Sequence, residues 1–165
     1  MLINSENFKK IQEKKTTHIK KFTTLEVDYD FNFLIKYIED YSCRISLGGS
    51  YNSTWSAFAY WYHPPFNLIE NFIRETFKYR VDPDDRDGCE MFYTFSSGSG
   101  PSHVDREDIF LLGLHGKTIY KVGDDYYTVE KGDLLFVAGG VMHKAIAVTP
   151  RIVASFGFFG GRNES

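Results

Sequence analysis

The sequence predicts a mostly-β domain, a jelly-roll barrel with two or so helices packed on it. Two patterns in the 165-residue chain support this prediction. From residue 89 onward, short apolar segments alternate with glycine-rich turns, which is typical of a β-barrel or β-sandwich. Before residue 88, apolar residues recur twice at the spacing of an amphipathic helix. Apolar residues are 42% of the chain, which is enough to fill a core and argues against disorder.

Two helices are predicted in the N-terminal half. The first covers the apolar stripe of residues 31–41, and Asp30 is placed to cap its start. The second covers residues 68–77 and follows two consecutive prolines, which break regular structure. Between them, the aromatic segment 54–62 is predicted to be a strand. We expect both apolar stripes to face a sheet rather than a partner protein.

Seven strands are predicted in the C-terminal half, at residues 90–95, 108–114, 118–122, 126–129, 133–137, 144–148 and 151–159. A jelly-roll barrel is the natural closed form for so many short strands, so we expect the barrel core at residues 89–160. Residues 22–88 would add the helices and one more strand. Residues 22–165 are therefore predicted to form a single domain.

Charge is unevenly distributed along the chain. The formal net charge is −3, which gives no reason to expect nucleic-acid binding. Residues 1–21, however, carry six lysines and two glutamates, a local balance of +4. We interpret residues 1–21 as a solvated basic N-terminal arm, with an electrostatic docking arm as the alternative.

The cysteines and the apolar segments indicate where in the cell the protein is expected. Cys43 and Cys89 lie far apart and form no C-x-x-C pattern, which argues against a disulfide scaffold and fits a reducing compartment. No apolar run approaches the length that spans a bilayer, and the N-terminus lacks the apolar segment of a secretory signal. We therefore expect a cytoplasmic protein that does not bind membranes.

A short motif suggests a metal site. His103 and Asp105 are separated by one residue in a strand-like stretch. Because side chains alternate between the two faces of a strand, both should point to the same side and could bind one ion. This motif is weak by itself, since it often arises by chance.

A second motif strengthens the interpretation. Gly132 opens the stretch GDLLFVAGGVMH, which ends at His143. The pattern resembles the second motif of the cupin superfamily, with Ala138 where proline is usual. Gly116 lies 11 residues after Asp105, where the first cupin motif places its glycine. The resemblance covers residues 98–159 and implies a double-stranded β-helix barrel that binds a metal.

The chain departs from an ordinary cupin at two of the usual ligand positions. Asp105 stands where a second histidine is usual, and Ile109 stands where a metal-binding glutamate is usual. Three ligands would remain, namely His103, Asp105 and His143. Two imidazoles and one carboxylate leave three adjacent coordination positions open, which is the arrangement of non-heme Fe(II) oxygenases.

The wider context resembles the JmjC-type cupin hydroxylases, including ribosomal-oxygenase-like members. The matching stretches are GPSHVD at residues 100–105, the apolar strand 109–112 and GKTIY at residues 116–120. This resemblance implies an Fe(II)- and 2-oxoglutarate-dependent dioxygenase. Such an enzyme oxidises 2-oxoglutarate to succinate and CO2 while it hydroxylates a C–H bond.

The cosubstrate requires a basic residue in the barrel, because a buried carboxylate needs a charged partner. In the JmjC-type family this residue stands two positions after the turn glycine, where the present chain has Thr118. Lys117 and Arg151 are the competing candidates, and we favour Arg151. The candidate hydroxyl donors beside them are Thr118, Tyr120, Tyr93 and Ser155.

Other interpretations stay open. The barrel could be a metal cupin of another activity, such as a cosubstrate-independent dioxygenase, an isomerase or a lyase, or a non-catalytic ligand-binding module. The expected substrate is a small molecule or an exposed protein side chain, and a homodimer is an additional expectation. Four aromatic residues are candidates to line a substrate pocket, although core packing is the alternative, namely Trp55, Tyr60, Trp61 and Phe92. Three other histidines are expected at the surface or in loops, namely His18, His63 and His115.

Overall fold

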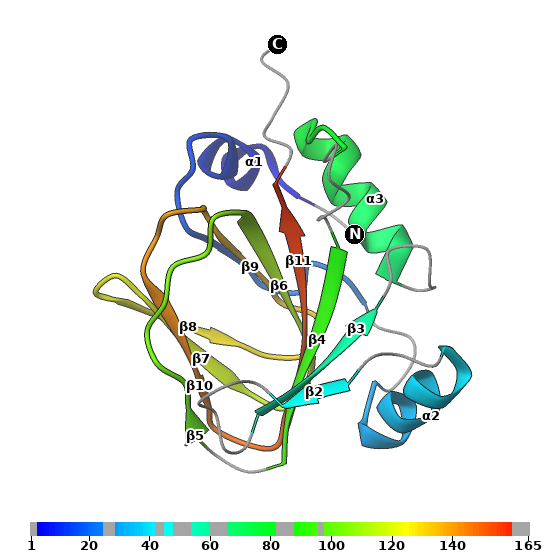
Figure 1. The fold of residues 1–165 in the computed structure, drawn as a ribbon. Coiled ribbons are helices and arrows are strands. Elements are labelled where there is room, and N and C mark those ends of the chain that lie inside the picture. The colour runs from blue at the N-terminus through cyan, green and yellow to red at the C-terminus, as the bar shows by residue number, and fades with distance from the viewer. Residues whose placement is uncertain are drawn as a thin grey trace.

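The strands form two antiparallel sheets that pack face to face (Figure 1). The computed structural model describes residues 3–24, 29–41, 45–47, 54–59, 66–81, 88–95 and 98–159. The larger sheet has the order β1 (Thr17–Ile19), β9 (Leu134–Val137), β6 (Asp108–His115), β11 (Arg151–Phe158), β4 (Gly88–Thr94), β3 (Thr54–Ala59) and β2 (Ile45–Leu47). The smaller sheet has the order β5 (Gly98–Ser99), β10 (His143–Ala147), β7 (Thr118–Val122) and β8 (Asp125–Val129).

The path of the chain between the sheets defines the fold. From β4 onward the chain alternates between the sheets: β5, β7, β8 and β10 belong to the smaller sheet, and β6, β9 and β11 to the larger one. This winding is that of a double-stranded β-helix, so the predicted jelly-roll fold is confirmed. The predicted strand positions agree with the observed strands to within two residues at each end in the described C-terminal half. Residues 60–62 of the predicted strand 54–62 lie outside the described residues.

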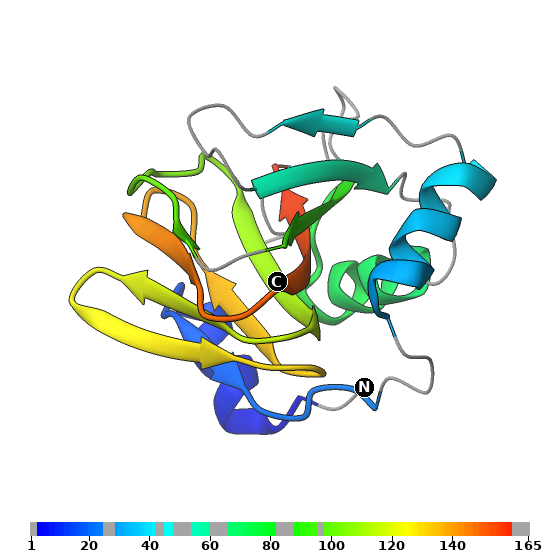
Figure 2. The same cartoon turned by 90° about the horizontal axis from the view of Figure 1, so that it is seen from below.

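Strand β6 of the larger sheet is buried on both faces. On β6, Phe110 and Leu112 pack on one face in a cluster that includes side chains of the helices, while Ile109 and Leu111 pack on the other face between the sheets. The near-continuous apolar run of β6 is therefore explained by burial on two sides rather than one. Figure 2 shows the smaller sheet and the helices α2 and α3 on opposite sides of the larger sheet.

The two predicted helices are present. Helix α2 (Phe31–Tyr41) begins after Asp30, whose side-chain oxygen accepts a hydrogen bond from the backbone N–H of Phe33 at 2.9 Å, as expected of an N-cap. Helix α3 (Phe66–Phe77) begins two residues earlier than predicted, because Phe66 is itself a buried core residue. No helix in the described parts of the chain is long and apolar enough to cross a bilayer.

The interpretation of residues 1–21 as a solvated arm is wrong for the described part of this segment. It contains helix α1 (Ser5–Gln12) and strand β1, which pairs with β9 at the edge of the larger sheet. Ile11 is fully buried, and Ile19 is 6% exposed. All six lysines are exposed: Lys9 and Lys10 lie in the amphipathic helix α1, and the other four follow it. The local charge therefore concealed a segment that packs on the barrel.

Candidate metal centre

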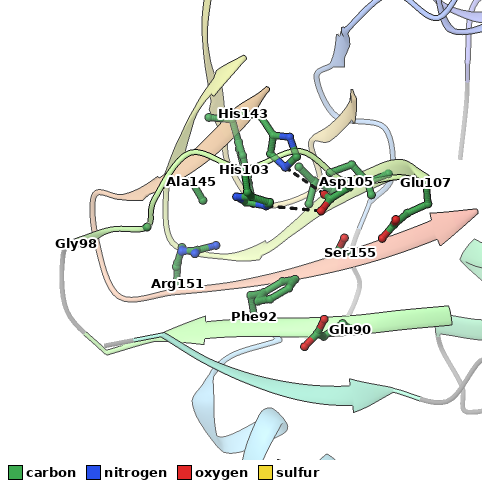
Figure 3. Close-up of a pocket in the computed structure, with 14 residues that line it drawn as sticks. Glu90, Phe92, Gly98, His103, Asp105, Glu107, His143, Ala145, Arg151 and Ser155 are labelled. Atoms are coloured by element: carbon green, nitrogen blue, oxygen red, sulfur yellow. Dashed lines mark ion pairs between the residues drawn. The ribbon is translucent and has the colours of Figure 1, made fainter. Parts of the chain in front are cut away.

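His103, Asp105 and His143 converge at one end of the barrel (Figure 3). Each offers one ligand atom, and these atoms all lie within 4.8 Å of one another. The two histidines form an isolated β-bridge in which each backbone N–H donates to the other carbonyl at 2.9 Å. Asp105 follows His103 on the same side, as the i, i+2 spacing predicts. The two separate sequence motifs therefore meet in space.

Hydrogen bonds orient both imidazoles so that Nε2 of each ring is directed to the shared site. Nδ1 of His143 lies 3.0 Å from the carbonyl oxygen of Val141, and Nδ1 of His103 lies 3.3 Å from that of Pro101. A carbonyl can only accept, so Nδ1 carries the proton in the neutral ring. The lone pair is then on Nε2, which faces Asp105 at 3.3 Å in His143 and at 3.8 Å in His103. Such carbonyl partners are typical of metal-binding histidines.

Asp105 and His143 shift each other's proton affinity. Burial alone would lower the pKa of His143, but the hydrogen bonds to Asp105 and to Val141 raise it above its usual value. Burial alone would raise the pKa of Asp105, but the contacts with His143 and His103 lower it. Asp105 therefore stays ionised. A divalent cation at this position would replace the proton that His143 and Asp105 otherwise share.

The triad opens into a pocket between the sheets that encloses about 180 Å³. His143 is 4% exposed, whereas His103 is exposed at the mouth. Apolar side chains of the larger sheet, including Ile109, Leu111 and Phe92, form part of the wall. The site is thus a half-open cavity with its donors on one side.

Arg151 supplies a buried positive charge to the same pocket. It opens β11, lines the pocket and is only 4% exposed. Among the described residues, its Nε and Nη1 atoms have no hydrogen-bond partner. Tyr120 lies beside it: burial raises the pKa of Tyr120, and the contact with Arg151 opposes that rise. Leaving buried donors of a charged group unpaired is costly, and an anion bound in the pocket would satisfy them.

Two further buried hydroxyl groups lie on strands β4 and β7. Thr94 faces Arg151 in the register of β4 and β11, and its buried Oγ1 atom has no hydrogen-bond partner among the described residues. The same holds for Oγ1 of Thr118, which lies two residues before Tyr120 on β7. Thr94 escaped the sequence interpretation, because only the strand register reveals its position opposite Arg151.

Of the other residues predicted to contact the cosubstrate, some line the pocket and others do not. Ser155 lines the pocket together with Arg151 and Tyr120. Lys117 instead forms a surface ion pair with Glu130 at 2.7 Å and does not line the pocket. Tyr93 points to the opposite face of β4 from Phe92, where its ring packs on Phe95. The expectation that Lys117 and Tyr93 contact the cosubstrate is therefore corrected, because neither lines the pocket. Lys117 points outward, and strand alternation places Tyr93 on the opposite face of β4.

Sequence reasoning also missed two acidic side chains of the pocket, Glu90 and Glu107. Figure 3 shows both on the side of the pocket away from Arg151. Glu90 faces Ser155 across the β4–β11 pair. The pattern of β4 could have revealed Glu90, because it shares a face with Phe92, which does line the pocket.

The remaining aromatic and histidine residues lie apart from the triad or outside the described structure. His18 is partly buried beside Asp133, with its Nε2 atom 3.2 Å from the carboxylate. His115 packs against the ring of Phe31. Three residues lie outside the described parts of the chain, namely Tyr60, Trp61 and His63, and the side chain of Trp55 is not described.

The fold and the site together define a cupin-type double-stranded β-helix with a candidate His–Asp–His metal centre. Among solved structures, the chain is similar to YcfD, a ribosomal oxygenase from Escherichia coli, with a TM-score of 0.73 and 17% sequence identity. It is also similar to YcfD in complex with cobalt and 2-oxoglutarate (TM-score 0.72, 17% identity) and with cobalt and succinic acid (TM-score 0.72, 18% identity).

These similarities extend over 99% of the chain, which spans about half, 53%, of the length of YcfD. At this level of identity they show a shared fold. No protein-family model matches the sequence, and no curated protein matches it.

Proposed function

We propose that this protein is an Fe(II)- and 2-oxoglutarate-dependent oxygenase. The observation that carries the proposal is the pairing of two features in one pocket. These are three candidate metal-ligand atoms and a buried guanidinium, two of whose donors have no hydrogen-bond partner among the described residues. An anionic cosubstrate would give the buried charge of Arg151 a partner beside the metal site. The similarity of the fold to YcfD, which has been crystallised with cobalt and 2-oxoglutarate, supports the same assignment.

The residues present fit both groups. His103, Asp105 and His143 would hold the metal from one side and leave the opposite side of its coordination sphere open. Arg151 would pair with the distal carboxylate of 2-oxoglutarate, and the hydroxyls of Thr94 and Thr118 would donate to the same anion. When bound, the metal and cosubstrate together supply the activation of dioxygen that protein side chains cannot provide.

The protein's own contribution is binding, orientation and exclusion of water. The carbonyls of Val141 and Pro101 fix the ring nitrogens that face the site. The apolar wall around Leu111 lowers the local dielectric, which strengthens the pairing of Arg151 with a carboxylate. Asp105 stays ionised and so supplies a negative ligand.

We further propose that the substrate is a protein side chain with a positive charge or N–H donors. Glu107 and Glu90 form an acidic side of the pocket, away from the position assigned to the cosubstrate. A carboxylate that lines a half-open cavity attracts cations and repels anions. A protein substrate also agrees with the name of YcfD as a ribosomal oxygenase.

Anaerobic titration tests the oxygenase assignment. Fe(II) should bind with a stoichiometry of one, and addition of 2-oxoglutarate should produce a weak visible charge-transfer band. Succinate has no 2-oxo group to complete a chelate and serves as the control that should not give this band. Fe(II) binding without any band on addition of 2-oxoglutarate would favour a metal cupin of another activity.

Peptide competition tests the substrate assignment. Short cationic peptides should stimulate the consumption of 2-oxoglutarate more than acidic peptides of equal length, because Glu107 and Glu90 favour the former. The preference should weaken at high salt, since the mouth of the pocket is partly exposed. Equal stimulation by both sets of peptides at low salt would contradict the proposal of a cationic substrate.

A further inference from the structure

The carboxylate of Asp108 joins three separated parts of the chain. Asp108 opens β6 three residues after Asp105, and it is 6% exposed. It accepts hydrogen bonds from Nζ of Lys14, from the hydroxyl of Tyr79 at 2.5 Å and from the backbone N–H of Gly139 at 3.1 Å. These donors follow helix α1, follow helix α3 and precede strand β10 respectively.

The hydrogen bond from Gly139 connects Asp108 to the His–Asp–His triad. Gly139 and Gly140 form the turn that precedes His143, and the N–H of Gly140 donates to the carbonyl of Asp105 at 2.9 Å. A side chain on Gly139 would come within 2.6 Å of the carbonyl oxygen of Arg106. The turn therefore lies directly on the segment that carries Asp105.

The same turn orients His143. The N–H of Val141 donates to the carbonyl of Ala138 at 3.2 Å, and the carbonyl of Val141 is the partner of Nδ1 of His143. One carboxylate thus anchors the turn that fixes the ring of His143 and that contacts the backbone of Asp105. The two sequence motifs of the metal centre are tied together at this turn.

The contact with Lys14 connects Asp108 to the N-terminal segment. Lys14 ends the turn after helix α1 with a φ of +60°, a left-handed conformation that a non-glycine residue rarely adopts. Its N–H donates to the carbonyl of Ile11, and its ammonium group reaches Asp108. A constrained backbone at Lys14 is thereby connected to the support of the metal centre.

We infer that Asp108 is a positioning residue for the metal centre, and that Lys14 makes the geometry of the centre depend on the N-terminal segment. The inference rests on the proposed function only in requiring that the triad binds a divalent metal. Asp108 is not one of the three ligand residues; its carboxylate instead holds the backbone that presents His143 and Asp105.

Asp133 offers a matched control. Its carboxylate is 7% exposed and also fastens the N-terminal segment, with the N–H of Lys21 at 2.9 Å and His18 at 3.2 Å. It also accepts from the N–H of Glu130, in the turn before β9. It therefore resembles Asp108 in burial and in partners, but within the described structure its carboxylate bonds to His18, Lys21 and Glu130 and not to the turn before His143.

The test compares metal affinity with stability. Asp108→Asn should weaken binding of Co(II), followed by its visible absorption, by about 10- to 100-fold, the range for outer-shell partners of metal ligands. Asp133→Asn should lower the melting temperature of the metal-free protein yet leave Co(II) affinity within about 2-fold. Lys14→Met should also weaken Co(II) binding, but by less than Asp108→Asn. It provides the test if Asp108→Asn does not fold.

The outcomes separate this inference from the proposed function. Wild-type affinity in Asp108→Asn, or in Lys14→Met where Asp108→Asn does not fold, would overturn the inference. An equal loss in Asp133→Asn would also overturn it, since that loss would reflect general destabilisation. A wild-type protein that binds Co(II) but gives no 2-oxoglutarate band with Fe(II) would overturn the oxygenase assignment alone. Failure of the wild-type protein to bind Co(II) would overturn both.

Discussion

Replacement of Asp105 by alanine is expected to abolish high-affinity metal binding and, with it, all activity that depends on the metal. Asp105 is the only carboxylate among the three ligand atoms that the described structure brings together. Without it, a divalent cation would face two neutral imidazoles and no negative ligand. The loss should exceed the roughly 10- to 100-fold typical of outer-shell substitutions. Isothermal titration with Fe(II) under anaerobic conditions would measure it.

A matched control is Asp124→Ala, which removes an exposed carboxylate from the turn between β7 and β8. This variant should bind Fe(II) like the wild type. Asp105→Ala should also lower the pKa of His143, because the contact with Asp105 is what raises it. Asp105→Ala with unchanged Fe(II) affinity would show that the metal binds elsewhere, and the triad would lose its assignment.

The barrel could be predicted because its local signals agree with its tertiary structure. Strand alternation placed His103 and Asp105 on one side, and the glycine turns fixed where His143 enters β10. These are short-range features, so a sequence pattern captures them. Gly116, for example, has a φ of +68°, and a side chain there would lie 2.0 Å from the carbonyl oxygen of Pro150, which explains the motif glycine at this position.

What could not be predicted depends on strand register and on long-range contacts. The sequence leaves Lys117 and Arg151 as competing anchors and favours Arg151 only slightly, whereas in the structure Lys117 pairs with Glu130 at the surface and Arg151 is buried in the pocket. Thr94 became a candidate only through its pairing with Arg151 across β4 and β11. No periodicity in the sequence encodes which side chains of separate strands share a cavity.

The N-terminal segment illustrates a different limit. Its lysines dominate the composition, yet its apolar residues Ile11 and Ile19 are buried. A short amphipathic helix carries a weak periodic signal, and its stability comes from packing rather than from intrinsic propensity. The contact between Lys14 and Asp108, which we propose supports the metal centre, is a long-range contact that charge counting could not reveal.

Replacement of Arg151 by alanine should raise the concentration of 2-oxoglutarate required for activity by about 30- to 5000-fold. This range corresponds to the roughly 2–5 kcal/mol that truncation of one partner of a buried charge pair typically costs. Arg151→Lys should fall between the wild type and Arg151→Ala, because lysine keeps the charge but loses the bidentate fork. The measurement is the dissociation constant from the charge-transfer titration, together with the 2-oxoglutarate KM.

Lys117→Ala is the matched control, since Lys117 is a neighbouring cation that pairs with Glu130 outside the pocket. It should leave the 2-oxoglutarate requirement unchanged, and Arg151→Ala should leave Fe(II) affinity in the absence of 2-oxoglutarate nearly unchanged. The reverse pattern, with the requirement raised in Lys117→Ala and normal in Arg151→Ala, would move the anchor to Lys117.

The stability of Arg151→Ala provides an independent test of the same assignment. In the metal-free protein, two donors of the Arg151 guanidinium are buried without a partner among the described residues. Removal of this uncompensated charge should offset much of the lost packing, so the free energy of unfolding without 2-oxoglutarate should change little. The wild type should instead gain stability as 2-oxoglutarate binds in the presence of Fe(II), and the variant should not. A pocket that evolved for stability alone would show the opposite, because Arg151 would then stabilise the protein without its anion.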